Sequence, residues 1–304
     1  MFDGMDSTLM TVVLPSAIGE LTHSTAANTI GHYGSLVGSA FLFGWMLGGI
    51  LIGMVGDRLG RVRSMILSIT LYAVFTGLAG LSQTWWQLAI CRFLTGLGIG
   101  GELVSITTFL AEVWPERSRS IAIGILITSY QAGVLVAGAI VKIFPHWRTV
   151  FLIGALPAVL TVFLRLTLRE SDRWLESKQQ SSEDYRLLRE LFRREHRRNV
   201  TVGAVAFGGL LIGYWASLSW IPAWIQTFFT PPAGASERAI ATMWQGFAAV
   251  LGCSAAGWIS DRIGRVPTIV ISYTGCFMAS ALLFLTNDRF SDLIYDGSAV
   301  LCLF

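Results

Sequence analysis

Four charged residues, Asp3, Asp6, Arg92 and Glu102, lie within long apolar stretches of the sequence. At the centre of a bilayer each costs about 2.5–3.5 kcal/mol or more, so each needs a charged partner or a water-filled cavity. Carboxyl groups in such surroundings can bind and release protons near neutral pH, and an arginine stays charged and presents a fork that fits a carboxylate. We therefore expect Asp3 and Asp6, together with Glu102, to carry a proton, and Arg92 to attract an anion or to adjust their proton affinity.

The spacing of these residues predicts that they gather in one place. Asp3 and Asp6 are three residues apart and share a helix face. Arg92 and Glu102 are ten residues apart, a rotation of about 80°, so that one cavity could face both. The alternative is a static ion pair that holds the helices together and takes no part in proton movement.

The elements that must hold these residues are membrane helices. Hydrophobic residues make up 53% of the 304 residues and charged residues 13%, against roughly 45–50% and 25% in soluble domains. This composition excludes a cytosolic enzyme, a disordered regulator and a nucleic-acid binder. Apolar stretches of about 18–25 residues predict membrane-spanning helices, and we find nine, with a tenth beginning at Ser298. The nine are residues 3–21, 33–55, 64–82, 85–111, 120–142, 147–168, 200–229, 239–260 and 266–286.

Basic residues set the expected orientation. Of the 22 Lys and Arg residues, 17 lie in the loops of one side and four in the alternate loops, and basic loops stay in the cytoplasm. We expect a multi-pass protein of the plasma (cell inner) membrane with a cytoplasmic N-terminus. Residues 169–199 form a long polar stretch, predicted as a cytoplasmic amphipathic linker helix. It would join a six-helix bundle, residues 1–168, to an incomplete second bundle, residues 200–304.

A ten-residue loop sequence occurs twice. Residues 53–62 read GMVGDRLGRV, residues 257–266 read GWISDRIGRV, and six of the ten positions are identical. Both copies fall at a turn between two predicted spans on the cytoplasmic side. Parallel repeats of this kind build transporters in which two bundles rock around a central site.

The charged residues of these loops are expected to form a latch that breaks when the bundles move; the alternative is that the arginines only anchor the loops in the cytoplasm. Gly60 permits a turn with positive φ, and Gly53 favours a close approach of two helices, as do Gly96 and Gly100 within the fourth span. The predicted latch consists of Gly53, Asp57, Arg58, Gly60, Arg61, Glu112, Arg119, Asp261, Arg262, Gly264 and Arg265.

The pattern G-x3-D-R-x-G-R in both halves resembles the signature loop of the major facilitator superfamily. Residues 112–119 resemble the E-x2-P-x3-R loop of sugar and metabolite proton symporters, and residues 169–177 resemble the segment after their sixth helix, without its two prolines. Residues 92–102 resemble their fourth-helix motif, and residues 2–6 the D-G-x-D of aromatic-acid symporters. The resemblance implies an all-α fold of two bundles and twelve helices, of which this chain would hold nine and the start of a tenth.

Polar and aromatic residues of the fifth, seventh and eighth spans complete the expected site. The resemblance implies that the seventh and eighth helices face the cavity, where rings could stack on a cyclic substrate. The alternative for the outermost Trp residues is a belt at the membrane surface. The candidates are Tyr130, Gln131, Tyr214, Trp215, Trp244 and Gln245.

These observations together predict a secondary transporter that takes up a small organic anion, a carboxylate or aromatic acid, with protons by alternating access. A sugar:proton symporter is one alternative, and a truncated, non-transporting membrane fragment or sensor is another. Four His in loops and four separate Cys form neither a metal site nor a catalytic set, so we expect no enzyme activity and no cofactor beyond the coupling proton. The expected partners are the substrate and the lipid bilayer, with the protein acting as a monomer and binding no nucleic acid.

Overall fold

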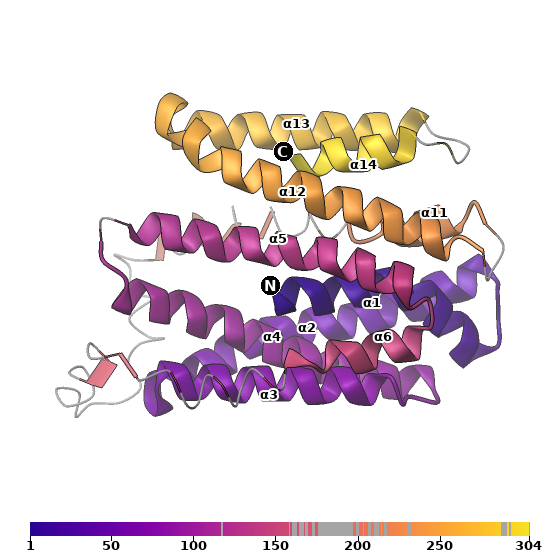
Figure 1. Cartoon of the computed structure of the whole chain (residues 1–304), viewed down its shortest axis with the longest axis horizontal. Coiled ribbons are helices and arrows are strands. Elements are labelled where there is room, and N and C mark those ends of the chain that lie inside the picture. Colours follow the sequence, from indigo (N-terminus) through magenta and orange to yellow (C-terminus); the bar gives the residue numbers. More distant parts are fainter. Residues whose placement is uncertain are drawn as a thin grey trace.

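Every regular element in the described part of the chain is a helix (Figure 1). The computed structural model describes residues 1–157 except 117, scattered residues between 159 and 215, and residues 218–303 except 230–232, 287–290 and 292. The helices run alongside one another, as expected where a bilayer offers backbone groups no hydrogen-bond partner. Most of the predicted linker, residues 169–199, and Tyr214 lie outside the described residues.

The first group of helices follows the first six predicted spans. α2 and α3 both pack on α4, and α1 packs on α5 and α6. For α6 the described helix ends at Gly154, and the described residues of the predicted span beyond it are scattered. The group consists of α1 (Phe2–Thr22), α2 (Ala27–Leu59), α3 (Arg61–Ala79), α4 (Trp85–Val113), α5 (Arg119–Ile143) and α6 (Trp147–Gly154).

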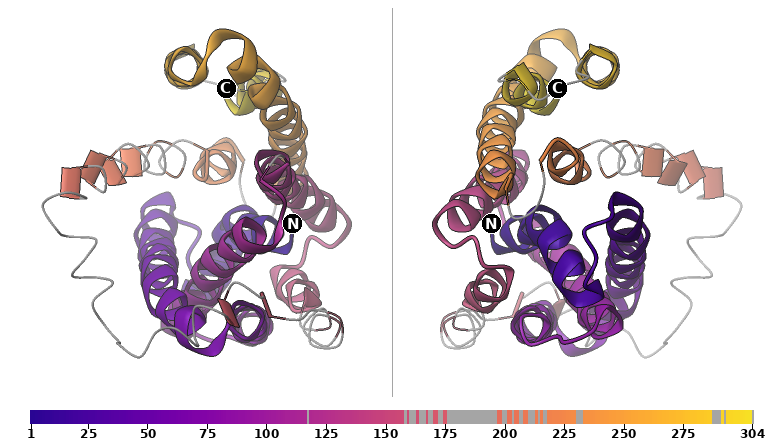
Figure 2. Two further views of the ribbon diagram at one scale, coloured as in Figure 1. Left: turned by 90° about the vertical axis from the view of Figure 1, so that its left-hand side faces the viewer. Right: turned by 90° about the vertical axis from the view of Figure 1, so that its right-hand side faces the viewer.

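The second group lies beyond α5. The end-on views of Figure 2 show α13 and α14 on the far side of α12 from α5. α14 begins at Leu293, five residues before the predicted start at Ser298, because Asp296 is accommodated in its first turn, where a negative charge favours a helix. The group consists of α11 (Ile221–Gln226), α12 (Ala235–Ile263), α13 (Arg265–Thr286) and α14 (Leu293–Leu303).

The outer surface of the bundle is apolar. Six of the described helices (α2, α3, α4, α5, α12 and α13) are long and apolar enough to cross a membrane. On α2, Phe43, Met46 and Ile50 form an outward stripe in which each residue is about half exposed. A stripe of this kind is unfavourable in water and favourable in lipid, so six of the nine predicted spans are confirmed as helices that can cross a membrane.

Glycines let α2 and α4 touch through their backbones. A methyl group at Gly44 or Gly48 of α2 would overlap the carbonyl oxygens of Phe93 and Leu97, and Gly96 and Gly100 of α4 face the backbone of α2 in the same way. The predicted packing through Gly96 and Gly100 is therefore confirmed. Gly53 is different, because an added methyl group would meet Val104 at an ordinary 3.4 Å.

α12 packs closely on α5, and α1 packs on the same helix. Gly138 of α5 lies against the backbone oxygen of Ala239, and Gly246 of α12 lies against the backbone of Leu135. On the other side of α5, Gly133 faces the backbone of residues 1–5 of α1. α5 therefore contacts both groups of helices at glycine positions where the backbones approach closely.

Gly48→Ala should destabilise the protein by about 1–3 kcal/mol, because the new methyl group forces α2 away from Leu97. Gly38→Ala on the same helix is the matched control, since an added Cβ there meets no atom within 4 Å. The measurement is the thermal unfolding midpoint of each variant in detergent. Equal midpoints for the two variants would contradict backbone contact between α2 and α4.

Candidate functional site

Asp6 of α1 and Arg92 of α4 form an ion pair inside the first group of helices. Nη1 of Arg92 lies 3.3 Å from Oδ2 of Asp6, and both side chains are fully buried. Thr76 of α3 donates a 2.6 Å hydrogen bond to Oδ1 of Asp6. The guanidinium also lies 4.5 Å from the ring centre of Phe151. The two opposite charges compensate each other, which is the condition for holding charges in an apolar interior, while Nε and Nη2 of Arg92 have no hydrogen-bond partner among the described residues.

Asp3 and Glu102 form a second group next to this pair. Their carboxyl groups are neighbours, and the hydroxyl of the buried Tyr72 lies beside Glu102. Oδ1 of Asp3, Oε2 of Glu102 and the Tyr72 hydroxyl have no hydrogen-bond partner among the described residues. Two carboxyl groups this close repel each other when both are ionised, so the arrangement suits one shared proton.

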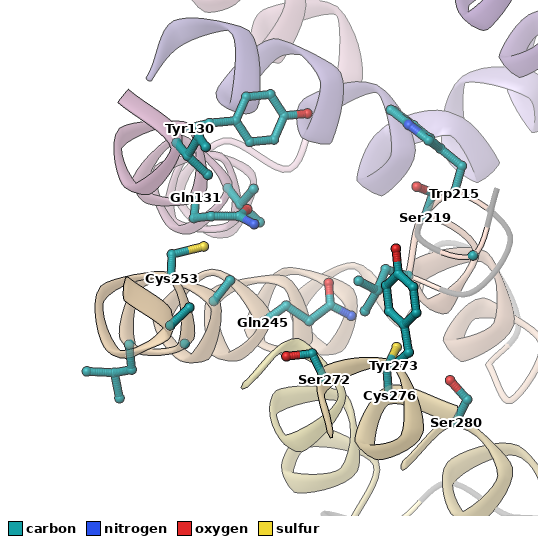
Figure 3. Close-up of a pocket in the computed structure, with 18 of the residues that line it drawn as sticks. Tyr130, Gln131, Trp215, Ser219, Gln245, Cys253, Ser272, Tyr273, Cys276 and Ser280 are labelled. Carbon is teal, nitrogen blue, oxygen red and sulfur yellow. The ribbon is translucent and has the colours of Figure 1, made fainter. Parts of the chain in front are cut away.

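A cavity of about 1010 Å³ lies between the two groups of helices, lined by α1, α5, α12 and α13 and by residues of the 205–219 segment. Figure 3 shows hydroxyl, amide and aromatic side chains pointing into it from several helices. None of the described residues that line it is charged. Its labelled polar and aromatic residues are Tyr130, Gln131, Trp215, Ser219, Gln245, Cys253, Ser272, Tyr273, Cys276 and Ser280.

Four of the six predicted cavity residues line this cavity: Tyr130, Gln131, Trp215 and Gln245. Trp244 does not; it is 45% exposed and packs on Phe247. The physical reason is its position next to Gln245, since consecutive helix residues point about 100° apart. Tyr214 falls among the residues that are not described.

The polar stripe of α13 was not predicted to be part of the site. Thr268, Ser272, Cys276 and Ser280 recur every four residues and all line the cavity. This spacing places small polar side chains on one face of an apolar helix, and it is visible in the sequence. Cys253 and Cys276 also line the cavity, although neither was predicted to be part of the site.

The four charged residues lie beside the cavity and not in its described lining. Arg92 and Asp6 face each other within the bundle, so the expected single cavity that faces both Arg92 and Glu102 is not found. Ser7 provides the connection. It follows Asp6 in the chain, lines the cavity, and its hydroxyl lies 2.9 Å from the hydroxyl of Tyr130.

Three of the charged residues predicted for the latch form a network of ion pairs in the first half. Nη1 of Arg61 lies 2.5 Å from Oδ1 of Asp57, and its Nε lies 3.1 Å from Oε1 of Glu112 at the end of α4. Gly60, between α2 and α3, has a φ of +112°, the conformation for which glycine was expected there. Arg61 thus ties the turn between α2 and α3 to the end of α4.

Two residues of the latch were missed by the sequence analysis. The carboxylate of Glu170 accepts hydrogen bonds from the backbone N–H groups of Val62 and Arg63 at 3.0 and 3.1 Å, which caps the N-terminus of α3. The indole of Trp174 donates to the backbone oxygen of Asp57 at 3.0 Å. Both belong to the segment 169–177 that resembles a family motif, and only the resemblance could have identified them.

Two other predicted members of the latch differ from the expectation. An added methyl group at Gly53 would meet no atom closer than 3.4 Å. Nε and Nη2 of Arg119 have no hydrogen-bond partner among the described residues. The ion pairs of Arg61 join the turn between α2 and α3 to the end of α4.

The second copy of the loop has the same turn but different contacts. Gly264 has a φ of +91°, as the repeat predicts. Arg262 lies over the ring of Trp258, 3.7 Å from its centre, and Asp261 makes no ion pair with any described side chain. The side chain of Arg265 is not described.

These features define a class of protein. A helical bundle with an apolar outer surface holds a largely apolar cavity between two groups of helices, with several uncharged polar groups in its lining and buried charges beside it. Among the described residues no three His, Cys, Asp or Glu side chains are grouped to hold a metal ion. This is the architecture of a membrane carrier.

A model of the Major Facilitator Superfamily matches residues 1–304, and the chain belongs to this family. A putative metabolite transport protein of Haemophilus influenzae is 30% identical, over 99% of this chain and 74% of the relative. The cis,cis-muconate transport protein of Acinetobacter baylyi is 27% identical, over 94% of this chain and 70% of the relative.

The fold matches that of the xylose transporter XylE from E. coli, in a partially occluded inward-open conformation. The TM-score is 0.77 with 16% identity, over 99% of this chain and 78% of that one. The protein is therefore an integral, multi-pass secondary transporter and not an enzyme.

Asp6→Asn and Arg92→Gln should each destabilise the protein by about 3–5 kcal/mol, because each leaves the other charge buried without its partner. The double variant should recover part of this loss, and thermal unfolding of all four proteins in detergent measures the coupling. Thr76→Val is the control, expected to cost about 1 kcal/mol for one hydrogen bond. Strictly additive losses in the double variant would show that the two charges do not stabilise each other.

Proposed function

We propose that this transporter couples the uptake of a small organic anion, a carboxylate or aromatic acid, to the movement of protons by alternating access. One observation carries the proposal: the cavity, whose lining includes hydroxyl, amide and aromatic groups, adjoins the buried acidic residues of α1. Ser7 belongs to the cavity lining and adjoins Asp6. A change in the protonation of these acidic residues can therefore alter the cavity wall at Ser7.

The substrate class is supported by the cavity and by the relatives. The rings of Tyr130, Trp215 and Tyr273 can pack on a flat molecule, and the amides of Gln131 and Gln245 can donate hydrogen bonds to carboxylate oxygens. The relative from Acinetobacter baylyi is named for cis,cis-muconate, which carries two carboxylates. The likeness to the xylose transporter rests on 16% identity and supports the fold alone.

Asp3 and Glu102 are the proposed proton carriers. Each has an oxygen without a hydrogen-bond partner among the described residues, whereas Asp6 is held by Arg92 and Thr76. A proton shared by two neighbouring carboxyl groups is easily exchanged when water reaches them. Asp6 and Arg92 then keep α1 and α4 in place around this group.

The latch end of the bundle, which holds Asp57, Arg61 and Glu112, faces the cytoplasm in this proposal. The basic residues of its loops support this orientation, and with it a plasma-membrane location and a cytoplasmic N-terminus. The protein acts as a monomer, since the described cavity is formed within one chain.

Proteoliposomes that contain the protein should take up labelled carboxylates and not xylose. The panel is cis,cis-muconate, benzoate, 4-hydroxybenzoate and xylose, measured with an inward proton gradient and again with a protonophore. A gradient of about one pH unit should support about tenfold accumulation for each coupled proton, and the protonophore should abolish accumulation. Uptake of xylose alone, or accumulation that survives the protonophore, would overturn the proposal.

Asp3→Asn and Glu102→Gln should remove accumulation but leave exchange of internal for external substrate, because exchange needs no net movement of protons. Asp296→Asn is the matched control, since this carboxylate is exposed on α14. Both activities are measured on the same proteoliposomes. An unchanged pH dependence of uptake in Asp3→Asn and Glu102→Gln would exclude these residues as proton carriers.

A further inference from the structure

Arg238, in the first turn of α12, is buried without an acidic partner. Its side chain is 2% exposed, and no described carboxylate forms an ion pair with it. It donates hydrogen bonds to two neutral oxygens, Oγ of Ser16 at 3.0 Å and the carbonyl of Gly234 at 3.3 Å. Its Nη1 has no partner among the described residues. This is unlike Arg92, whose charge is balanced by Asp6.

Arg238 lies at one end of the contact between the two groups of helices, where α1 ends and α12 begins. Ser16 lies in the last third of α1, and Arg238 lies in the first turn of α12. Both are at the opposite end of the bundle from the turn between α2 and α3 (Figure 1). The hydrogen bond between them therefore joins the two groups at the end away from the latch.

Arg238 also belongs to the face of α12 that leads into the cavity. Arg238, Thr242, Gln245 and Ala249 are spaced by four, three and four residues, which places them on one helix face. Gln245 and Ala249 line the cavity. Arg238 is two turns from Gln245, or about 10 Å along the helix axis. It therefore lies on the same face of α12 as the cavity-lining residues, nearer the start of the helix.

We infer that Arg238 selects negatively charged substrates at the end of the cavity opposite the latch, and that its contact with Ser16 closes this end. The inference rests on the proposed function and names the group that recognises the carboxylate. Separation of α1 and α12 at this end breaks the bond to Ser16 and exposes the guanidinium. An entering carboxylate then meets a cation that has a free fork of donors, before it reaches the uncharged cavity.

The described lining of the cavity supports this role, because it contains no charged side chain. Arg92 forms an ion pair with Asp6, packs on Phe151 and has no exposed surface, while its Nε and Nη2 have no hydrogen-bond partner among the described residues. Of the two buried arginines in the described part of the chain, Arg238 is the one without an ion pair, and Glu237 is its acidic neighbour in the chain. In this proposal the entrance selects substrates by charge, and the cavity selects them by shape.

Arg238→Gln and Arg238→Lys test the charge. The probes are 4-hydroxybenzoate and its uncharged amide, 4-hydroxybenzamide, with the KM for uptake of the acid and the inhibition constant of the amide measured in proteoliposomes. Arg238→Gln should raise the KM for the acid about tenfold, as expected for loss of a charge-assisted hydrogen bond. The amide should change less than about twofold. Arg238→Lys, which keeps the charge, should stay within about threefold of the wild type for both.

Ser16→Asp and Ser16→Asn test the same point with Arg238 in place. Ser16 is exposed, so both replacements fit. Ser16→Asp supplies a built-in carboxylate for Arg238 and should raise the KM for the acid about tenfold, whereas the uncharged Ser16→Asn of the same size should not. This pair decides the question if Arg238→Gln is not recovered in the membrane.

The failures of the two proposals are distinguishable. If the wild type takes up no carboxylate of the panel, the proposed function is wrong and the role of Arg238 with it. If the wild type takes up the acid and neither Arg238→Gln nor Ser16→Asp changes the ratio of acid to amide constants, only the role of Arg238 is overturned.

Discussion

An ionised side chain among apolar helices is stable only when another group replaces the water that it has lost. The structure meets this constraint in two ways. Asp6 and Arg92 form an ion pair at 3.3 Å, which joins α1 to α4. Arg238 forms no ion pair among the described residues and bonds to Ser16 and a carbonyl oxygen. An ion pair favours one arrangement of helices, and a buried charge without a counter-ion favours any arrangement that brings it water or an anion.

The two ends of the bundle are therefore held differently. At one end Arg61 joins Asp57 and Glu112 by ion pairs among partly exposed side chains, which are weak individually because water screens them. At the other end a buried arginine touches a hydroxyl of the opposite helix. The two contacts also differ in what they join. Asp57, Arg61 and Glu112 all belong to the first group of helices, whereas the bond from Arg238 to Ser16 joins the two groups between which the cavity lies.

The sequence predicts the helices well because apolar length alone defines a membrane span. It also predicts contacts that depend on a local pattern, such as the ion pairs of Arg61 and the positive φ of Gly60. It fails where the direction of a helix face decides: Trp244 was expected in the cavity and Gln245 alone lies there. Periodicity gives the angle between two side chains, but only packing on α5 determines which of them points inward.

Glu170, which follows the sixth helix in the chain, caps the N-terminus of α3. Together with the bond from Trp174 to the backbone of Asp57, it fastens the start of the connection between the two halves to the turn beside the latch. Helix caps contribute about 1 kcal/mol, so this fastening can be released by forces well below those that unfold a helix. A displacement of Glu170 or Trp174 would therefore reach the turn between α2 and α3 directly, through the backbone groups to which they bond.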